Sequence, residues 1–373
     1  MRTVCFLNEN TLGHSSYLPR FAEAIASESN GAWGVNRIDV APLPEEREAA
    51  AQDKIRGAVR LGISTYYRKW REQASSHALE LWRKNGSGDA LVVNTQSVGL
   101  DLPGQLPDQL PMFVCLDATF RQLSSSPWFA PNTPSRLFQS LTRGDLLDRE
   151  QRLFDRAQIL LPWSESVAES LRNDYGIASA KIRLLPPSLH FPERLSSPRT
   201  KANGKPRLLF LGGDFSRKGG ETLLGCYHRY FSQTAELDIV TQSPVEASPG
   251  VRVWRGVKAN SEQWLQLWRD ADVFVFPSRL ETFGIVLLEA QSFGVPIVSS
   301  KAGAAQEILA NGKAGWLLNQ VDESSLAQAL QEALDNPLLR ESKAEYGYWR
   351  GKEKYDLRRN ARALLSWIEE LTA

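Results

Sequence analysis

Short apolar runs alternate with longer segments of mixed polarity along the whole chain. The apolar runs predict buried strands, and the segments between them, in which apolar residues recur at helical spacing, predict helices. The expected strands are residues 3–10, 90–96, 112–119, 158–163 and 182–188 in the first half, and 207–213, 237–242, 251–257, 273–278, 296–300 and 315–319 in the second. This alternation is typical of parallel α/β sheets covered by helices.

A polar stretch with several Pro and Gly residues, 194–206, separates the two groups of strands and predicts a linker between domains. The expected domains are therefore 1–193 and 207–350, and the helical C-terminal segment 351–373 is expected to pack back on the first domain. Ligands bind beyond the carboxyl ends of strands in such sheets. We therefore expect two parallel sheets that face a central cleft, with the active site in that cleft.

Composition excludes several classes of function. With 44 basic and 43 acidic residues, the chain carries no overall charge that would attract nucleic acid or a membrane. Three scattered cysteines, Cys5, Cys115 and Cys226, lack metal-ligand spacing and are interpreted as buried free thiols in a reducing compartment. The N-terminus leads directly into a strand, without a signal peptide or a long apolar span. We expect a cytoplasmic protein.

The most informative segment is PSRLETFGIVLLEAQSFGVPIVSS, residues 277–300. It follows an expected strand, enters an apolar helix near Gly284 and ends in a further strand. The start of such a helix presents backbone N–H groups that suit a phosphate. Glu281 precedes this helix start and Glu289 lies about two turns into the helix. Carboxylates on both sides of a phosphate seat suit a ligand with hydroxyls on both sides of a diphosphate, which is a nucleotide-sugar.

With its P-S-x-x-E-x-F-G beginning and its G-V-P-I-V ending, this segment closely resembles the E-x7-E motif of the retaining family 4 glycosyltransferases. Those enzymes have the GT-B fold, two Rossmann-like domains. The resemblance covers most of the C-terminal half and, more faintly, the N-terminal half. It implies that Glu281 holds hydroxyls of the donor sugar and that Glu289 binds the ribose. The backbone amides of Phe283, Gly284 and Ile285 would contact the distal phosphate.

A second glycine-containing turn, FLGGDFSRKGG at residues 210–220, also joins a strand to a helix. Gly213 permits close approach of the backbone, and Arg217 and Lys218 supply positive charge that would stabilise a departing diphosphate. The family has a spaced Arg and Lys here. Lys218 matches the Lys, whereas Asp214 stands at the Arg position in a loop one residue shorter, so Arg217 is the candidate replacement. The alternative is a basic helix start on the surface.

Four residues of the N-terminal half are candidates for donor or acceptor contacts. Gly13 lies in the loop where relatives place a glycine near the donor, and His14 beside it is either a polar contact or a solvated side chain. Asp117 ends a strand whose carboxyl end points into the expected cleft, and relatives carry a His or Asp near this place. Ser164 follows the next strand. Helix capping is the alternative for both Asp117 and Ser164.

Four further segments carry candidate chemistry or an alternative to it. Backbone near Val257 is expected to contact the base of the donor, and residues 124–138 are the candidate acceptor loop. The Asp270-Ala271-Asp272 sequence has the D-x-D form of a metal site, but it precedes a strand and is interpreted as a solvated helix cap. Residues 64–73, which follow Arg56 and Arg60, mix cations with aromatics. This segment is either a membrane-surface or acceptor-docking helix, or a solvated helix with its aromatics packed inward.

The resemblance implies a retaining glycosyltransferase that transfers a sugar from a nucleoside-diphosphate sugar to an acceptor hydroxyl of a glycan, a lipid-linked sugar or a small molecule. The expected catalytic residues are Glu281, Lys218, Arg217 and Asp117. No residue pattern identifies the carboxylate nucleophile of a double displacement, which favours a front-face substitution. We expect no cofactor, metal or nucleic-acid partner, and at most a weak peripheral contact with the inner face of a membrane.

Three alternatives remain open at this point. A sugar-nucleotide epimerase or a phosphorylase would share the fold and the donor site. A nicotinamide oxidoreductase would need a G-x-G-x-x-G turn after a strand, and residues 210–220 do not supply that spacing. A protein that binds sugar-nucleotides without catalysis is the third alternative, because the Arg of the family is missing at Asp214.

Overall fold

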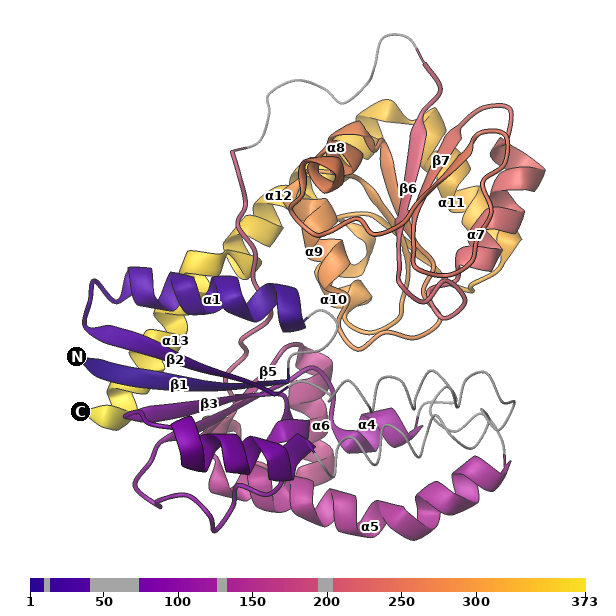
Figure 1. Ribbon diagram of the computed structural model, residues 1–373. Coiled ribbons are helices and arrows are strands. Elements are labelled where there is room, and N and C mark those ends of the chain that lie inside the picture. Colours follow the sequence, from indigo (N-terminus) through magenta and orange to yellow (C-terminus); the bar gives the residue numbers. More distant parts are fainter. Residues whose placement is uncertain (10–13, 41–73, 126–132, 194–203) are drawn as a thin grey trace. The chain divides into compact units, whose positions relative to one another are not determined.

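The computed structural model describes residues 1–9, 14–40, 74–125, 133–193 and 204–373, with the backbone alone at 14–16, 125 and 133–143 (Figure 1). The chain divides into two compact units, which are described separately. Unit 1 comprises Met1–Pro187 and Arg358–Ala373, and unit 2 comprises Ser188–Leu357. Most of the expected linker, residues 194–203, lies outside the described residues.

The division falls at different positions from those expected at 193 and 351, and backbone pairing explains why. The Leu189 amide donates to the Tyr355 carbonyl and the Leu357 amide donates to the Leu189 carbonyl, both at 2.9 Å. Phe191 packs edge-on against Tyr348 with ring centroids 5.9 Å apart. These contacts attach residues 188–193 to unit 2.

Unit 1 contains a five-stranded parallel sheet in the order β2-β1-β3-β4-β5. Its strands are β1 (Arg2–Glu9), β2 (Trp33–Val40), β3 (Ala90–Asn94), β4 (Met112–Leu116) and β5 (Ile159–Pro162). Its helices are α1 (His14–Glu28), a segment at 74–85, α4 (Phe120–Ser125), α5 (Thr133–Arg156), α6 (Glu165–Tyr175) and α13 (Leu357–Thr372), with short 3₁₀ turns η1 (Gln96–Val98) and η2 (Ser179–Lys181).

Two features of this sheet differ from the sequence-based expectation. Residues 182–188 do not form a strand: the Arg183 and Leu185 amides donate to the Leu160 and Pro162 carbonyls of β5, but the pairing ends there and counts only as an isolated bridge between Ile182 and Leu160. Pro186 and Pro187 have no N–H to donate to a ladder, which is the physical reason. Strand β2 is absent from the sequence-based expectation, because it is an edge strand that is only partly buried and whose sequence, WGVNRIDV, contains no continuous apolar run.

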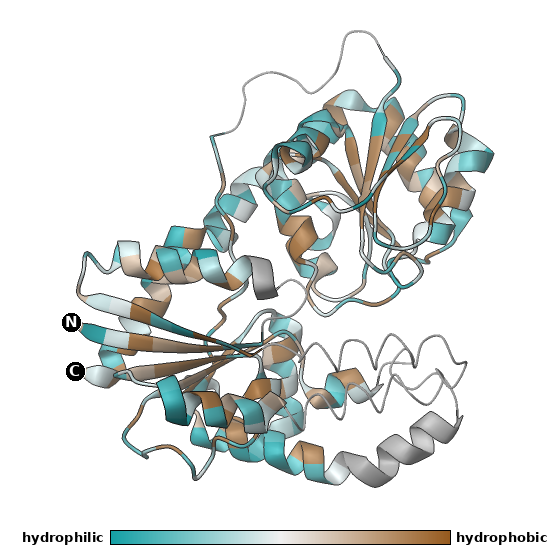
Figure 2. Ribbon diagram, in the orientation of Figure 1, coloured by the Kyte–Doolittle hydropathy of each residue, from teal (hydrophilic) through white to brown (hydrophobic). Residues whose placement is uncertain are grey.

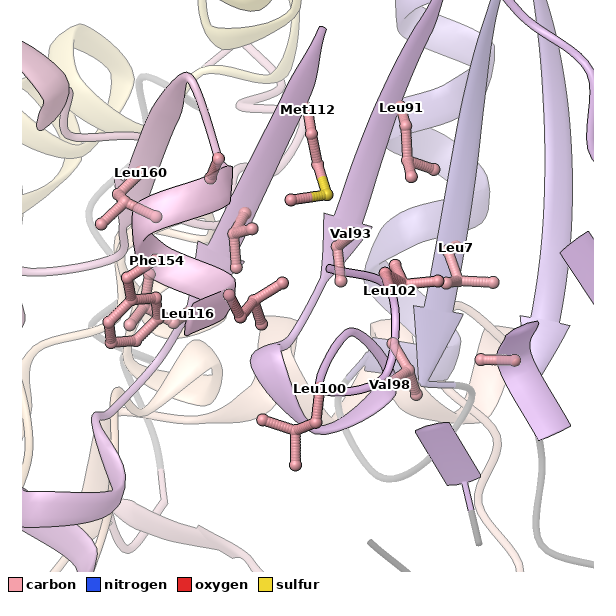
Figure 3. Packing of buried hydrophobic residues seen from close by; sticks show 14 of the residues in the cluster. Leu7, Leu91, Val93, Val98, Leu100, Leu102, Met112, Leu116, Phe154 and Leu160 are labelled. Carbon is pink, nitrogen blue, oxygen red and sulfur yellow. The ribbon is translucent and has the colours of Figure 1, made fainter. Parts of the chain in front are cut away.

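The core of unit 1 is built from its two central strands and the helices that cover them. All five residues of β3 and of β4 are buried, and Figure 3 shows Leu91, Val93 and Met112 of these strands with Phe154 of α5. Burial also raises the pKa of the Cys115 thiol to about 12. The three cysteines are buried and free, so they are poor nucleophiles.

The last helix, α13, packs within unit 1. The Trp33 indole donates to Glu369 at 3.3 Å, and Arg183 makes two hydrogen bonds of 2.8 Å to the carboxylate of Glu370. Leu364 and Ile368 of this helix are completely buried. Contacts with both the start and the end of the N-terminal segment therefore bind the C-terminal helix to unit 1.

Unit 2 contains a six-stranded parallel sheet in the order β11-β10-β9-β6-β7-β8. Its strands are β6 (Arg207–Leu211), β7 (Glu236–Val240), β8 (Val251–Trp254), β9 (Val273–Phe276), β10 (Ile297–Ser300) and β11 (Trp316–Leu318). Its helices are α7 (Gly220–Cys226), the π-helical η3 (Tyr227–Phe231), α8 (Glu262–Asp270), α9 (Ile285–Ser292), α10 (Ala305–Ile308), η4 (Ala310–Gly312), α11 (Glu323–Asp335) and α12 (Pro337–Tyr355).

The strand order places a switch point in the middle of unit 2. From β6 the chain moves outward to β7 and β8, and then returns to the other side of β6 to form β9. Connections therefore leave β6 and β9 in opposite directions, which is the arrangement at which doubly wound sheets bind ligands. Figure 2 shows hydrophobic strands inside each unit and hydrophilic residues on the outer helices.

Candidate active site

The β9–α9 junction forms one side of the switch point in unit 2. Gly284 is the N-cap of α9 with φ 99° and ψ 57°, a conformation in which a side chain would be strained. Its carbonyl accepts a hydrogen bond of 2.9 Å from the Leu287 amide, and no side chain caps the helix. The first turn of α9 also lacks an acidic residue. The helix start therefore keeps its partial positive charge for an anionic ligand.

The two glutamates predicted from the sequence lie on either side of this helix start. Glu281 is on the loop after β9 and Glu289 is on α9, and both are half-buried. The loop that carries Glu281 lies against Gly303 (φ 60°) of the loop after β10, where an added Cβ would lie 2.8 Å from the Thr282 carbonyl oxygen. Glycine at 303 is what allows the loop after β10 to approach the backbone next to Glu281.

The β6–α7 loop forms the other side of the switch point and touches the β9–α9 loop. Gly219 has φ 74°, and a Cβ there would lie 2.0 Å from the Pro277 carbonyl oxygen. The Arg279 amide donates to the Arg217 carbonyl at 3.0 Å. The two loops are therefore joined by direct backbone contact, which only a glycine at 219 permits.

An ion pair between Lys218 and Glu281 links the two loops at their side chains. The lysine and glutamate side chains are only 14% and 12% exposed. The ammonium also lies 4.8 Å from the centroid of the Phe276 ring. Burial lowers the pKa of Lys218, and the neighbouring Glu281 carboxylate partly opposes that effect. The structure thus brings together two residues that belong to separate sequence motifs, 210–220 and 277–300.

Arg217 lies beside this pair and is held by the loops themselves. Its guanidinium donates to the Leu280 carbonyl at 2.9 Å and lies 3.5 Å from the Asp214 carboxylate. Asp214 therefore pairs with Arg217. Arg217 is positioned by these contacts next to the loop that carries Glu281.

Two more predicted residues lie on the same edge of this sheet. A methyl group added to Gly213 would meet no heavy atom of the described residues within 4 Å, so the backbone there is open. Val257 follows β8, beside Gly256 with φ 69°. Sequence reasoning missed Ser243, whose hydroxyl donates to the Gly213 carbonyl at 3.1 Å and accepts from the Phe215 amide at 3.2 Å. Its place in the sequence, shortly after the expected strand 237–242, is the feature from which it could have been predicted as a site residue.

The D-x-D sequence has a structural role. Asp270 is 3.1 Å from the Arg207 guanidinium, and Asp272 accepts from the Arg207 amide at 2.8 Å. Asp272 is only 7% exposed, so the expectation of a solvated cap is wrong at this residue. Among the described residues no cluster of His, Cys, Asp and Glu could hold a metal ion.

In unit 1, Asp117 follows β4 directly and is half-buried. Its loop is fixed on both sides, because the Gln96 side-chain amide donates to the Ala118 carbonyl at 2.5 Å and the Phe120 amide donates to Glu150 at 3.0 Å. Ser164 is the N-cap of α6 and accepts from the Val167 amide at 3.4 Å, which is its capping role.

The remaining candidates of unit 1 fall outside the description in whole or in part. Gly13, residues 64–73 and the preceding Arg56 and Arg60 lie outside the described residues, as do positions 126–132 of the candidate acceptor loop. His14 begins α1, and only its backbone is described. None of the helices within the described ranges has the length and apolar character needed to cross a membrane.

Solved structures that resemble this chain cover nearly all of it. The sucrose-phosphate synthase of Thermosynechococcus elongatus superimposes with a TM-score of 0.71 at 18% identity, over 100% of this chain and 99% of that chain. Anabaena HepE in complex with UDP superimposes with a TM-score of 0.66 at 15% identity, over 99% of this chain and 100% of that chain. WaaG, a glycosyltransferase involved in lipopolysaccharide biosynthesis, superimposes with a TM-score of 0.63 at 17% identity, over 98% of this chain and 99% of that chain. The chain has the GT-B fold.

The family match by sequence lies within unit 2 of this GT-B protein. Residues 253–350 match the family described as "Glycosyl transferases group 1". The D-inositol 3-phosphate glycosyltransferase of Pseudarthrobacter chlorophenolicus is 28% identical over 226 residues, 51% of this chain and 51% of that protein. The capsular polysaccharide biosynthesis glycosyltransferase CapM of Staphylococcus aureus is 29% identical over 91 residues, 24% of each chain. The chain spans about half the length of the first relative.

The matched region includes only part of the candidate site. It contains Val257 and the β9–α9 junction with Glu281 and Glu289, but it begins after the β6–α7 loop with Lys218. The geometry of unit 2 is therefore what connects Lys218 to the matched segment.

Proposed function

We propose that this GT-B protein is a retaining glycosyltransferase that transfers a sugar from a nucleoside-diphosphate sugar to an acceptor hydroxyl. The observation that carries the proposal is the largely buried Lys218–Glu281 ion pair at the switch point between β6 and β9. It places a cation for a diphosphate and a carboxylate for sugar hydroxyls side by side, on loops that also include the start of α9. A donor with both groups matches this combination.

Each predicted residue then has a role in holding the donor. Glu281 accepts hydrogen bonds from sugar hydroxyls, and Glu289 binds the ribose. The distal phosphate is bound by the start of α9, through the backbone amides of Phe283, Gly284 and Ile285. Lys218, with Arg217 beside it, neutralises the diphosphate near the open backbone of Gly213, and the base lies near Val257.

The reaction we propose is a front-face substitution. The bond between the anomeric carbon and the phosphate oxygen breaks, and the acceptor oxygen bonds to that carbon on the same face. The acceptor proton passes to the leaving phosphate oxygen. Negative charge grows on the diphosphate as the bond breaks, and the Lys218 ammonium and the α9 start stabilise that charge. Asp117 in unit 1 contacts the sugar or the acceptor, and the reaction requires no metal.

Donor binding is the first test. HepE has been solved with UDP-glucose, which makes that compound the natural first probe, followed by GDP- and ADP-sugars. A ligand that binds the native state raises the melting temperature by mass action. A panel in which no nucleotide-sugar raises the melting temperature of the full chain would refute the proposal.

Turnover separates the transferase from its rivals. An epimerase converts the donor without an acceptor, a phosphorylase requires inorganic phosphate, and a non-catalytic binding protein converts nothing. Glu281→Gln should cut sugar transfer sharply while the circular dichroism spectrum stays unchanged. Inositol phosphate is a reasonable first acceptor to try, because several relatives are named D-inositol 3-phosphate glycosyltransferases.

A further inference from the structure

A cavity of about 360 Å³ lies beside β11, the strand at one end of the sheet in unit 2. Small-molecule sites have volumes of roughly 300–1,000 Å³, so this cavity is large enough for a small ligand. None of the residues around it belongs to the candidate active site at β6 and β9, and β10 stands between β11 and β9 in the sheet. The polar side chains that line the cavity are those of Lys301, Gln306, Asn311, Trp316, Asn319 and Lys343.

The charged side chains around this cavity are both positive. Lys301 follows β10 directly and is exposed, whereas Lys343 lies on α12 and is half-buried. Lys301 donates to the side-chain oxygen of Asn319 at 2.9 Å. Lys343 donates to the carbonyls of Gly312 and Gly315. Neither ammonium forms an ion pair with a carboxylate of the described residues, and the lining contains no aspartate or glutamate. Two cations therefore share one solvent-accessible cavity without a counter-charge in its wall.

Partial burial makes the missing counter-charge costly at Lys343. Burial lowers the pKa of Lys343, and the Glu332 carboxylate partly opposes that effect. The ammonium also lies 5.2 Å from the centroid of the Trp316 ring, which covers part of it with apolar surface. A charge that is taken out of water is stabilised when an opposite charge lies beside it. An anion in the cavity would supply that charge.

The amide side chains of the cavity add further hydrogen-bond donors. The side-chain oxygen of Asn319 accepts from Lys301, and that of Asn311 accepts from Gln306 at 2.9 Å. Because both oxygens already accept, each asparagine has its NH₂ group left for a ligand. An ammonium group has three protons, of which Lys301 uses one and Lys343 uses two in these contacts. The cavity therefore offers mainly donors and positive charge.

This combination selects a phosphate group among the common biological anions. A phosphate monoester carries a charge of about −1.5 to −2 at pH 7 and three acceptor oxygens, whereas a carboxylate carries one charge on two oxygens. Two ammonium groups and two NH₂ groups match the phosphate better. The volume of about 360 Å³ is about ten times the ~30 Å³ of a water molecule, so an organic part also fits. The Gln306 side-chain oxygen offers an acceptor to a hydroxyl of that part.

We propose that this cavity is a phosphate-binding site, separate from the proposed donor site, with Lys301 and Lys343 as its cations and Asn311 and Asn319 as further donors. Its ligand is a small molecule or headgroup that carries a phosphate monoester. The inference goes beyond the proposed function and does not depend on it, because the two sites share no residue. A soluble metabolite and a lipid headgroup present the same phosphate group, and the test below distinguishes them.

The test is calorimetric titration of the full chain with inorganic phosphate and with glucose 6-phosphate, each in the presence of excess UDP to occupy the proposed donor site. At least one probe should bind the wild type. Lys301→Gln should weaken its affinity about 10-fold, because a charged hydrogen bond is lost. Asn319→Asp, which places a carboxylate in the lining, should weaken it at least as much. Lys313→Gln removes an exposed lysine of the turn before β11 that does not line the cavity, and this matched control should change nothing.

The lipid source is tested by cosedimentation with phosphatidylcholine vesicles that contain or lack phosphatidic acid, whose headgroup is a phosphate monoester. Binding that requires phosphatidic acid and decreases in Lys301→Gln and Asn319→Asp, but not in Lys313→Gln, identifies a lipid headgroup as the ligand. Binding of the soluble probes with the same pattern, without vesicle binding, identifies a soluble phosphate compound.

Two results would overturn the inference: no binding of either soluble probe or of phosphatidic acid by the wild type, or equal affinity in the wild type and in folded Lys301→Gln and Asn319→Asp. An equal loss in Lys313→Gln would also contradict it, because the attraction would then come from surface charge in general. UDP affinity is measured in parallel and should be the same in the three variants as in the wild type. Phosphate binding at the cavity without any nucleotide binding would refute the proposed transferase, whereas nucleotide binding without phosphate binding would refute only the cavity site.

Discussion

The Lys218–Glu281 ion pair allows the strongest test of the candidate site, by a double-mutant cycle with Lys218→Met and Glu281→Gln. Methionine keeps much of the lysine stem that lies near the Phe276 ring, and glutamine keeps the shape of the glutamate. Each single substitution leaves a charged partner in a site where the two side chains are only 14% and 12% exposed. The cycle therefore measures the cost of an unpaired charge at the switch point.

The magnitude follows from burial. Removing one partner of a fully buried pair costs about 3–5 kcal/mol, whereas replacing both partners is often close to neutral. Because some of each side chain reaches water, we expect each single variant to lose about 2–3 kcal/mol and the double variant to lose less than the two losses added together. The coupling energy should be about 2 kcal/mol. The double variant should then lose about 2–4 kcal/mol, less than the two single losses added together.

Urea unfolding of the full chain, monitored by circular dichroism, gives the free energy of unfolding of the wild type, the two single variants and the double variant. These four values are taken from the unfolding transition whose midpoint changes in the single variants. Ligand binding supplies the second measurement. Lys218→Met should weaken both UDP and UDP-glucose about 10-fold or more, because a charged hydrogen bond to the diphosphate is lost. Glu281→Gln should weaken UDP-glucose alone, since its proposed partner is the sugar. Additive stabilities, or equal loss of both ligands in both variants, would refute the reasoning.

Two further predictions concern the same loops. The Lys218 side chain is charged below its pKa and neutral above it, and burial lowers that pKa. The affinity for UDP should therefore decrease at a pH lower than the pKa of an exposed lysine. Glu281→Gln removes the carboxylate that opposes this shift, so a pH titration of UDP binding should show the fall at a still lower pH, and an unchanged profile would contradict this. Gly219→Ala places a Cβ 2.0 Å from the Pro277 carbonyl oxygen and should destabilise the fold by more than about 2 kcal/mol in urea unfolding. Gly213→Ala, which meets nothing within 4 Å, is its control and should stay within about 0.5 kcal/mol of the wild type.

The apolar runs predicted most of the strands, because a strand buried on both faces must be apolar along its length. Strand β9 and the start of α9 at Gly284 could be predicted from local sequence alone. An apolar run and a glycine turn can be recognised without knowing which other segments they contact. The same rule failed at residues 182–188, where Pro186 and Pro187 cannot donate to a ladder. It also missed β2, which lies at an edge and is only partly buried.

The αβ alternation, the helix start that suits a phosphate and the pair of glutamates around it could therefore be predicted from local pattern. The tertiary structure alone decided which residues meet. Lys218 and Glu281 are 63 positions apart and come together because β6 and β9 are neighbours in the sheet. Glu9 and Thr95 meet because β1 pairs with β3. Periodicity reports how each segment is buried, but only the order of the strands brings their ends to the same edge.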